Sequence, residues 1–305
     1  MNTPPHFLKL ADRSPQQYRA LFDRTRELNE RRRRHLVDAT LTGRTLGMMF
    51  EKASTRTRLS FEAAISQLGG HAVVLPYSES QLARGEPLTD TARVVSSYVD
   101  AIVMRTFGEA RLHAFVDAAT VPVINGLTDE GHPIQLVADL FTIEEKLGGV
   151  QGKKVAFIGD GCSNMARSFI EAARLFDFEL RLARPSAFKP PREEAEAAHA
   201  HLQETESPAE AVQGADVIVT DVWTSMGQEA ETARRNQAFN GFCVDGALLR
   251  LASPRAIVMH CLPAHRGEEI SAEVIDGSQS VVFEEAENRL HVQKALLEQI
   301  LFYGS

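Results

Sequence analysis

Hydroxyl and guanidinium side chains are concentrated just after the apolar run LGMMF (46–50). They are Ser54, Thr55, Arg56, Thr57 and Arg58. Apolar residues then recur at helical spacing, so we expect a strand that ends at Phe50 and a helix that begins near Arg56. The free N–H groups of a first helical turn bind phosphate, and arginine adds charge. An N-cap with surface arginines is the alternative. One hydroxyl suffices for a cap, however, so the coincidence of three favours an anion site.

Two further segments place polar side chains after apolar runs. Arg105 follows DAIVM (100–104), and the carboxyl end of a buried parallel strand faces the crevice where open α/β sheets bind ligands. A surface ion pair is the alternative for Arg105. In GHPIQ (131–135), proline at the first helical position leaves His132 and Gln135 three residues apart, so both can reach one small ligand. At this position, His132 can donate to a developing oxyanion.

The second half of the chain carries its own polar segments, DGCSN (160–164), DVWTSMG (221–227) and HCLP (260–263). Residues 136–305 hold 16 basic and 26 acidic side chains, whereas residues 1–135 hold 17 and 15. Carboxylates and amides suit a cationic amine. We therefore expect the first half to bind an anion and the second half an amine.

Two other interpretations of the second half remain open from the residues alone. Gly159 and Gly161 lie between a strand pattern and a helix pattern, as in a dinucleotide-binding turn. The third glycine position holds Asn164, and Arg184 stands where an NAD site would have an acid, so an NADP-dependent oxidoreductase is a weak alternative. His260, Cys261 and His265 could bind a metal, but no second cluster accompanies them and we assign none.

The elements that must position these residues alternate between strand and helix. Short apolar runs occur at 46–50, 71–75, 100–104, 121–125, 153–159, 178–183, 216–222 and 256–262. Runs that are apolar on both faces are typical of parallel strands covered by helices, which indicates an α/β chain. Ser14-Pro15 and His132-Pro133 are helix starts, and Gly148-Gly149 ends a helix. We place the domain hinge near 135–150, and a last helix at 286–302.

Composition limits the function classes. The 305 residues suffice for two domains, and the net charge of −8 disfavours nucleic acid or an anionic membrane as a partner. The run Arg31 to Arg34 is expected to be a solvated helix end. Three unpaired cysteines favour a reducing compartment, and without a leader or an apolar span we expect a cytoplasmic protein.

The segment FEKASTRTRLSFE (50–62) resembles the phosphate-binding signature of the aspartate/ornithine carbamoyltransferase family, and the other motifs follow in the family's order. The resemblance implies an α/β fold of two domains, each a parallel β-sheet flanked by helices, with the active site in the interdomain cleft. It implies a carbamoyl-phosphate-binding domain at 1–135 plus 286–305 and an ornithine-binding domain at 136–285. SMG and HCLP resemble the ornithine enzymes, which transfer a carbamoyl group to the side-chain amine of L-ornithine.

Site residues follow from matching positions. For carbamoyl phosphate the resemblance implies Ser54, Thr55, Arg56, Thr57, Gln81, Arg105, His132, Gln135, Cys261, Leu262 and Arg289. For ornithine it implies Asn164, Asp221, Ser225 and Met226. Arg105 and His132 would stabilise the oxyanion, and Cys261 paired with Asp221 is the candidate proton acceptor.

The resemblance also bears on partners. It implies no cofactor, and a homotrimer or an assembly of trimers in which Gln81 reaches the phosphate of a neighbouring subunit. The chain departs from the family at Ser163, where ornithine enzymes commonly have asparagine, which puts the shape of the acceptor pocket in question. A non-catalytic relative would have lost site residues, and none of Arg56, Arg105, His132, Cys261 or Arg289 is missing.

Overall fold

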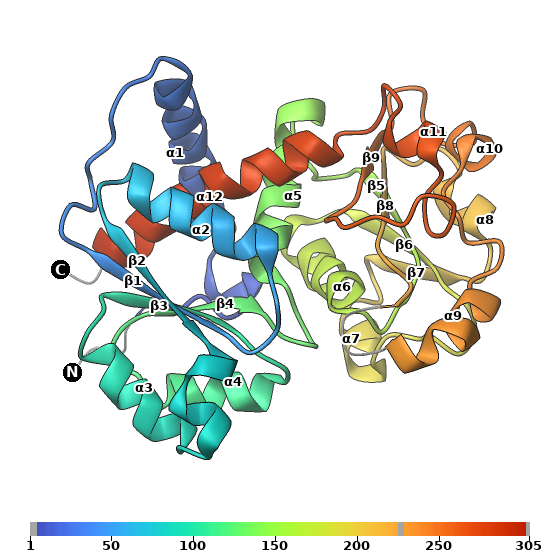
Figure 1. Ribbon diagram of the computed structural model, residues 1–305. Helices are drawn as coiled ribbons and strands as arrows, with labels where there is room; N and C mark the ends of the chain where they lie inside the picture. The colour runs from blue at the N-terminus through green and yellow to red at the C-terminus, as the bar shows by residue number, and fades with distance from the viewer. Residues whose placement is uncertain (1–4, 225–228, 303–305) are drawn as a thin grey trace. The chain divides into compact units, whose positions relative to one another are not determined.

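The structure is a computed structural model that describes residues 5–224 and 229–302 (Figure 1). It divides into two compact units, one of Met1–Val137 with Glu287–Ser305 and the other of Ala138–Ala286. Each unit contains a parallel β-sheet flanked by helices, so the predicted α/β fold class is confirmed. Among the described residues, no helix has both the length and the apolar character needed to cross a bilayer.

The first unit is built on a four-stranded parallel sheet in the order β2-β1-β3-β4. Its strands are β1 (Thr45–Phe50), β2 (His71–Pro76), β3 (Ala101–Arg105) and β4 (Val123–Leu127). The strand order reverses between β1 and β3, where Phe50 pairs with Arg105. The carboxyl ends of strands at such a reversal are where open α/β sheets bind ligands.

Helices cover both faces of this sheet, with α2 on one face and α3 and α4 on the other (Figure 1). The helical segments are η1 (Leu10–Asp12), α1 (Pro15–Arg33), α2 (Thr55–Gln67), η2 (Tyr77–Glu79), η3 (Gln81–Arg84), α3 (Leu88–Ser96), α4 (Glu109–Val116) and the start of α5 (Pro133–Leu147). The last helix, α12 (Val282–Phe302), supplies residues from Glu287 onward to this unit. Two ion pairs hold it there: a buried one between Lys294 and Asp38 at 3.1 Å, and a partly exposed one between Glu298 and Arg24 at 2.6 Å.

The second unit contains a five-stranded parallel sheet in the order β7-β6-β5-β8-β9. Its strands are β5 (Lys154–Ile158), β6 (Glu179–Ala183), β7 (Leu202–Thr205), β8 (Val217–Thr220) and β9 (Ile257–Met259). The helical segments are α6 (Asn164–Phe176), α7 (Arg192–Ala197), α8 (Pro208–Val212), η4 (Glu229–Glu231), α9 (Thr232–Ala238), α10 (Gly246–Leu249) and α11 (Ala272–Ile275). Here the order reverses between β5 and β8, which predicts a ligand site in the loops after these two strands.

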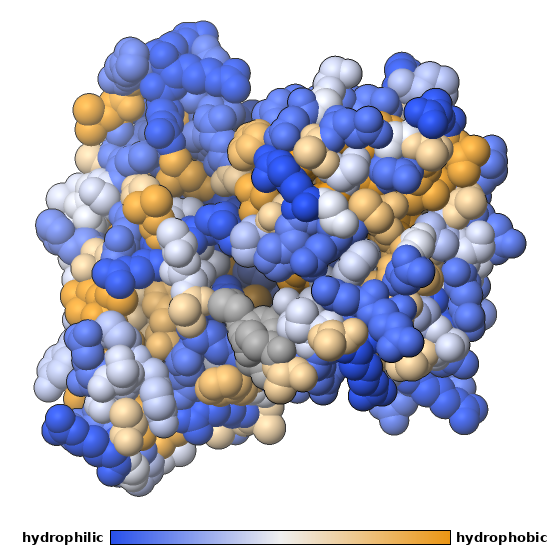
Figure 2. Space-filling view, turned by 45° about the vertical axis from the view of Figure 1, so that its right-hand side comes forward, coloured by the Kyte–Doolittle hydropathy of each residue, from blue (hydrophilic) through white to orange (hydrophobic). Residues whose placement is uncertain are grey.

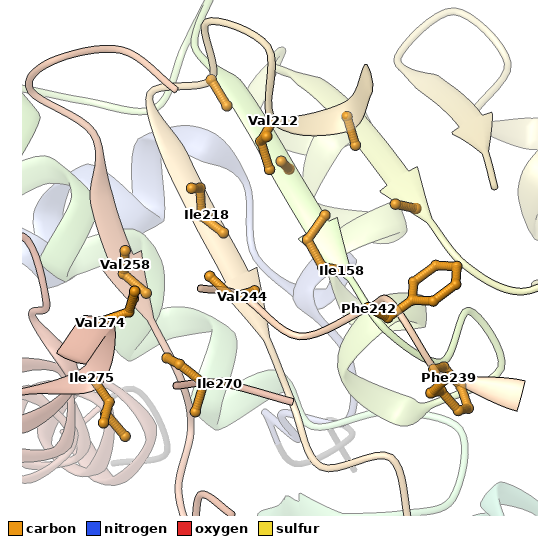
Figure 3. Packing of buried hydrophobic residues seen from close by; sticks show 14 of the residues in the cluster. Ile158, Val212, Ile218, Phe239, Phe242, Val244, Val258, Ile270, Val274 and Ile275 are labelled. Atoms are coloured by element: carbon orange, nitrogen blue, oxygen red, sulfur yellow. The ribbon is translucent and has the colours of Figure 1, made fainter. Parts of the chain in front are cut away.

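One face of the second sheet is covered by an apolar cluster (Figure 3). Ile158, Ile218 and Val258 project from neighbouring strands, and Val212 and Val274 pack on them from α8 and α11. Phe188, Trp223, Phe239 and Phe242 extend the cluster to the carboxyl ends of the strands. The loops there are therefore anchored on the core.

The helix starts read from the sequence are confirmed at two positions. Ser14 caps α1, accepting a hydrogen bond from the Gln17 N–H at 3.3 Å, and Pro15 is the first helical residue. Pro133 is the first residue of α5, which ends at Leu147. The next residue, Gly148, has a φ of +76°, a left-handed conformation that glycine adopts easily because it has no Cβ atom.

The apolar runs coincide with eight strands, but a ninth among the described residues, β7, was not predicted. Its sequence LQET holds one apolar residue, and it lies at the edge of the sheet with Gln203 and Glu204 exposed. An edge strand that is open to solvent lacks the apolar pattern that a central strand requires.

Candidate functional site

The anion site predicted after β1 lies at the first turn of α2. Ser54 is the N-cap residue of this helix, but its hydroxyl makes no capping hydrogen bond. The hydroxyl can therefore bind a ligand. Arg58 pairs with Glu62 at 3.0 Å on the exposed face. Arg56 is half-buried, and its guanidinium group makes no hydrogen bond or ion pair to any described residue. Of the two predicted guanidinium groups, Arg56 is therefore the one available to an anion.

Arg289 connects three elements of the first unit. From α12, its Nη2 donates to Thr57 Oγ1 on α2 at 2.6 Å, and its Nη1 donates to Gln135 Oε1 on α5 at 2.7 Å. All three side chains are buried. Because a buried charge is stabilised only when its partners are well oriented, this network fixes the start of both helices. Residues separated by as many as 232 positions in the chain thus meet at the anion site.

Arg105 and His132 lie buried at the carboxyl ends of β3 and β4 in the same unit. Burial holds the pKa of His132 well below its usual value, and the positive charges of Arg289 and Arg105 lower it further. The imidazole is therefore neutral near pH 7. A neutral imidazole still has one N–H to donate to an oxygen that gains negative charge.

Glu51 and Lys52 also organise the loops of the first unit, and the sequence analysis did not single them out. Glu51 accepts a bidentate bond from Arg111 at 2.6 and 2.8 Å and a hydrogen bond from the hydroxyl of Thr106. Lys52 pairs with Asp129 and lies 4.7 Å above the Phe107 ring. These contacts tie the loop after β1 to those after β3 and β4. Only the position of both residues directly after a strand could have indicated them.

Gln81 lies apart from this hydrogen-bonded group. It is the first residue of η3 and is exposed, and its side chain makes no hydrogen bond to any described part of its own chain. Gln81 is predicted to contact the phosphate bound by a neighbouring subunit, and a single copy of the protein does not test that prediction.

In the second unit, Asn164 and Asp221 occupy the two loops at the reversal of strand order. Asn164 is the first residue of α6, and Asp221 follows β8 directly. The hydroxyl of Ser163 caps α6, accepting a hydrogen bond from the Ala166 N–H at 3.1 Å. Serine and asparagine are equally good N-caps, so the departure at Ser163 preserves the helix start. Ser225 and Met226 lie outside the described residues.

Asp221 and Cys261 form a hydrogen-bonded pair. The Cys261 thiol donates to Asp221 Oδ1 at 3.3 Å, and the Val222 N–H donates to the same oxygen at 2.8 Å. Burial, and then the carboxylates of Asp221 and Glu285, raise the pKa of Cys261 well above its usual value. Burial also raises the pKa of Asp221. The thiol therefore keeps its proton and donates it in the hydrogen bond, and the carboxylate is the member of the pair that can accept a further proton.

Leu262 follows in a left-handed backbone conformation, with φ of +56°. Its N–H donates to His260 Nδ1 at 2.9 Å, and His260 Nε2 lies 3.0 Å from Glu269 Oε1. A strained residue beside a site persists only where its surroundings hold it, and buried His260 supplies this support.

The same contacts bear on the metal interpretation. His260, Cys261 and Asp221 are close enough to share an ion, and so are His265, Glu268 and Glu269. Both ring nitrogens of His260 are already engaged by Leu262 and Glu269, so His260 is not free to bind an ion in this arrangement. The predicted group of His260, Cys261 and His265 is not brought together, because His265 falls in the second cluster.

The features that suggested a dinucleotide have structural explanations. A Cβ on Gly161 would lie 2.5 Å from the Phe188 carbonyl oxygen, so the glycine is required by close packing of the chain against itself. Arg184 is buried and pairs with Glu204 at 2.8 Å. Neither feature indicates a nucleotide phosphate.

Family models match both parts of the chain. The model described as "Aspartate/ornithine carbamoyltransferase, carbamoyl-P binding domain" matches residues 5–145, and that described as "Aspartate/ornithine carbamoyltransferase, Asp/Orn binding domain" matches residues 151–300.

Individual relatives are similar over nearly the whole chain. Ornithine carbamoyltransferase from Nitrosococcus oceani is 53% identical over 302 residues, covering 99% of each chain. That of Chromobacterium violaceum is 49% identical over 304 residues, covering 99% of this chain and 98% of the relative. The solved ornithine carbamoyltransferase from Pyrococcus furiosus has a TM-score of 0.91 at 42% identity, covering 98% of this chain and 97% of its own. That from Burkholderia thailandensis has a TM-score of 0.90 at 46% identity, covering 97% and 98%.

Proposed function

The chain belongs to the aspartate/ornithine carbamoyltransferase family, and we infer that it is an ornithine carbamoyltransferase. It transfers the carbamoyl group of carbamoyl phosphate to the side-chain amine of L-ornithine, giving L-citrulline and phosphate. Among the described residues, the observation that carries this conclusion is the partly buried Cys261–Asp221 pair at the acceptor site. It provides a carboxylate to receive the proton that the amine must lose.

Carbamoyl phosphate is bound by the first unit. The phosphate lies at the turn Ser54 to Thr57, where Arg56 and the helix N–H groups neutralise it. The carbamoyl group lies against Arg105, His132 and Gln135, with Cys261 and the backbone at Leu262 beside it. The Arg289 network supports this assignment, because it aligns Thr57 and Gln135 before substrate arrives.

Ornithine is bound by the second unit through Asn164, Asp221, Ser225 and Met226. Its side-chain amine has a pKa of about 10.4 when free in water, so the site must favour the neutral form. Asp221 takes that proton, with the Cys261 thiol holding the carboxylate in place. The amine nitrogen then attacks the carbonyl carbon.

The oxyanion that forms is stabilised by the positive charge of Arg105 and the N–H of neutral His132. The tetrahedral intermediate collapses when the bond from carbon to the phosphate oxygen breaks; phosphate leaves with the electron pair and takes up the surplus proton of the attacking nitrogen. Orientation and electrostatics carry the reaction, which needs no covalent enzyme intermediate and no cofactor.

We propose that the active assembly is a homotrimer or contains trimers, with Gln81 of one copy completing the phosphate site of another. Apolar side chains interrupt the hydrophilic surface on the face shown in Figure 2. In the first unit, Leu59 on α2, Val73 on the edge strand β2, and Tyr98 after α3 are 63%, 53% and 75% exposed. A partner subunit that packs against any of these side chains would remove apolar surface from water, which favours association.

A cytoplasmic location is part of the same proposal, since Cys162, Cys243 and Cys261 are all free thiols. The reaction fits arginine biosynthesis, and it could also run toward carbamoyl phosphate in catabolism.

The acceptor is tested by measuring phosphate release from carbamoyl phosphate with L-ornithine, N-acetylornithine, putrescine, L-lysine and L-aspartate in parallel. We expect ornithine to give the highest kcat/KM. If aspartate or putrescine were preferred, the assignment of the acceptor would be wrong although the family would stand.

A further inference from the structure

A second arginine network lies in the acceptor-binding unit, at Arg235 on α9. Its Nη1 donates to Asp160 Oδ2 at 2.7 Å and to the Trp223 carbonyl oxygen at 2.9 Å. Its Nε lies 3.2 Å from Glu231 Oε2. The Arg235 side chain is only 7% exposed, as is that of Asp160. One guanidinium group thus joins the loop after β5 to the loop after β8.

These two loops carry the residues assigned to ornithine. Asp160 Oδ1 accepts the Cys162 N–H at 2.8 Å, which shapes the turn that leads to Asn164. Trp223 lies two residues after Asp221. A shift of Arg235 would therefore move Asn164 and Asp221 relative to one another.

The guanidinium group of Arg235 packs against the aromatic side chains of the core. Its central carbon lies 5.1 Å from the centre of the Phe188 ring. Phe188 packs on Phe239 at 4.7 Å, and Trp223 stacks on the same ring at 5.6 Å with an interplanar angle of 13°. Phe239 is a buried member of the apolar cluster shown in Figure 3. A cation over an aromatic face, supported by a packed core, is a rigid anchor.

Stability alone is a poor explanation for this network. Desolvating an arginine and an aspartate offsets most of their attraction, and apolar residues of similar size often serve a core equally well. An apolar side chain could not form hydrogen bonds to the loops after β5 and β8, whereas the planar guanidinium group of arginine bonds to both.

We propose that Arg235 is a positioning residue for the amino-acid acceptor, setting the spacing between Asn164 and Asp221 without touching the substrate. The proposal rests on the assignment of ornithine to this unit. It extends the acceptor site to a residue more than 70 positions from Asn164 in the sequence.

The principal variant is Arg235→Lys, which keeps the charge but loses the planar fork. We expect the KM for ornithine to rise about 10- to 100-fold, as for a misplaced binding group, while the KM for carbamoyl phosphate stays within about twofold. Arg24→Lys is the matched control: Arg24 is likewise held by several hydrogen bonds of its guanidinium group, here a bidentate pair with Glu298, but in the first unit. It should lower stability without changing the KM for ornithine.

Asp160→Asn decides the matter if Arg235→Lys does not fold. Asparagine has the same shape and can still accept the Cys162 N–H, while Arg235 keeps Glu231 as a partner. Binding is followed independently by fluorescence, since Trp223 is the one tryptophan of the chain. L-Norvaline, which has the backbone groups of ornithine but no terminal amine, serves as the unreactive probe.

A selective loss of ornithine and norvaline affinity in the folded variant supports the proposal. Unchanged affinity, or an equal rise in the KM values of both substrates, overturns it. The unsubstituted protein is assayed first with all acceptors. If another amine proves to be the substrate, the KM values of the variant and the unsubstituted protein are compared for that amine. The acceptor assay thus tests the proposed function, and the comparison of KM values tests the role of Arg235 separately.

Discussion

The Cys261 thiol donates a hydrogen bond to Asp221 Oδ1 across 3.3 Å. Burial and the neighbouring carboxylates raise the pKa of the thiol well above its usual value, and the thiol hydrogen bond lowers the pKa of Asp221 against the effect of burial, so the proton stays on sulfur and the negative charge on the carboxylate. Sequence motifs identified the two residues as partners in proton transfer. The direction of the hydrogen bond supports a division of roles, in which we propose Asp221 as the base and Cys261 as the group that orients it.

Asp221→Asn should therefore remove the base while preserving the shape of the site. We expect kcat to fall by about 10²- to 10⁴-fold, the usual contribution of general-base catalysis. Steady-state kinetics with ornithine and carbamoyl phosphate measures this. A variant that retained more than a tenth of the rate would exclude Asp221 as the proton acceptor.

Cys261→Ala should lower the rate less than Asp221→Asn does, and it should shift the pH dependence of the rate in one direction. The thiol hydrogen bond lowers the pKa of Asp221, opposing the effect of burial, so its loss should raise that pKa further. The acidic limb of the kcat/KM profile should then move to higher pH, because Asp221 must be ionised to accept a proton. Cys243→Ala, a free cysteine of the same unit, is the control. An unmoved profile in Cys261→Ala would leave this cysteine with a packing role only.

Arg56→Ala should nearly abolish turnover without unfolding the protein, since the phosphate loses its unpaired guanidinium. We expect a loss of at least about 10²-fold in kcat/KM for carbamoyl phosphate, comparable to removing one preorganised electrostatic group. Arg58→Ala is the matched control, because Arg58 lies two residues away and pairs with Glu62 on the surface. Equal effects in the two variants would refute the assignment of Arg56.

Shared sites predict complementation between inactive variants. Gln81→Ala and Arg56→Ala should each be poorly active alone. Mixed under conditions that exchange subunits, they should regain activity, because a hybrid can combine an intact Arg56 with an intact Gln81 from its neighbour. Absence of any recovery, with mixed assemblies demonstrated by mass, would indicate that Gln81 does not cross between subunits.

His291 on α12 makes stability sensitive to pH. Burial lowers its pKa to about 4, and Arg32 contributes in the same direction. Between pH 6.5 and 4 the unfolded chain binds a proton at His291 that the folded protein does not. Its contribution to stability is therefore complete above pH 6.5 and is lost as pH falls through this window, by up to ~1.4 kcal/mol per pH unit.

Urea unfolding from pH 4.5 to 7 tests this with His291→Leu, which cannot titrate. The Nε2 atom of His291 lies 3.7 Å from Glu287 Oε1, too far for a hydrogen bond, and neither ring nitrogen has a hydrogen-bond partner in the described structure, so the substitution should be tolerated. The variant should show a shallower loss of unfolding free energy toward acid than the unsubstituted protein. Parallel curves would assign the acid sensitivity to other groups.

Much of the fold was predictable because buried parallel strands need continuous apolar runs, and eight of them stand out. The edge strand β7 was missed for the complementary reason, since Gln203 and Glu204 face solvent and leave no apolar pattern. The site residues of the loops could be predicted because each follows a strand or opens a helix.

The connections between those residues could not be predicted. The exception is Arg58, because Glu62 lies four residues later on the same helix face, and this local spacing could have indicated that Arg58 rather than Arg56 is paired. Arg289 and Arg235 meet partners far away in sequence, through packing that no local pattern encodes. Arg235 left one faint signal, its position four residues before the buried Phe239 on the same helical face.

The most direct test of the account is the stoichiometry of products from carbamoyl phosphate and L-ornithine. With the purified protein, citrulline and phosphate should appear in equal amounts, and both should depend on ornithine. Phosphate released without citrulline, or at the same rate when ornithine is omitted, would contradict carbamoyl transfer to the amine.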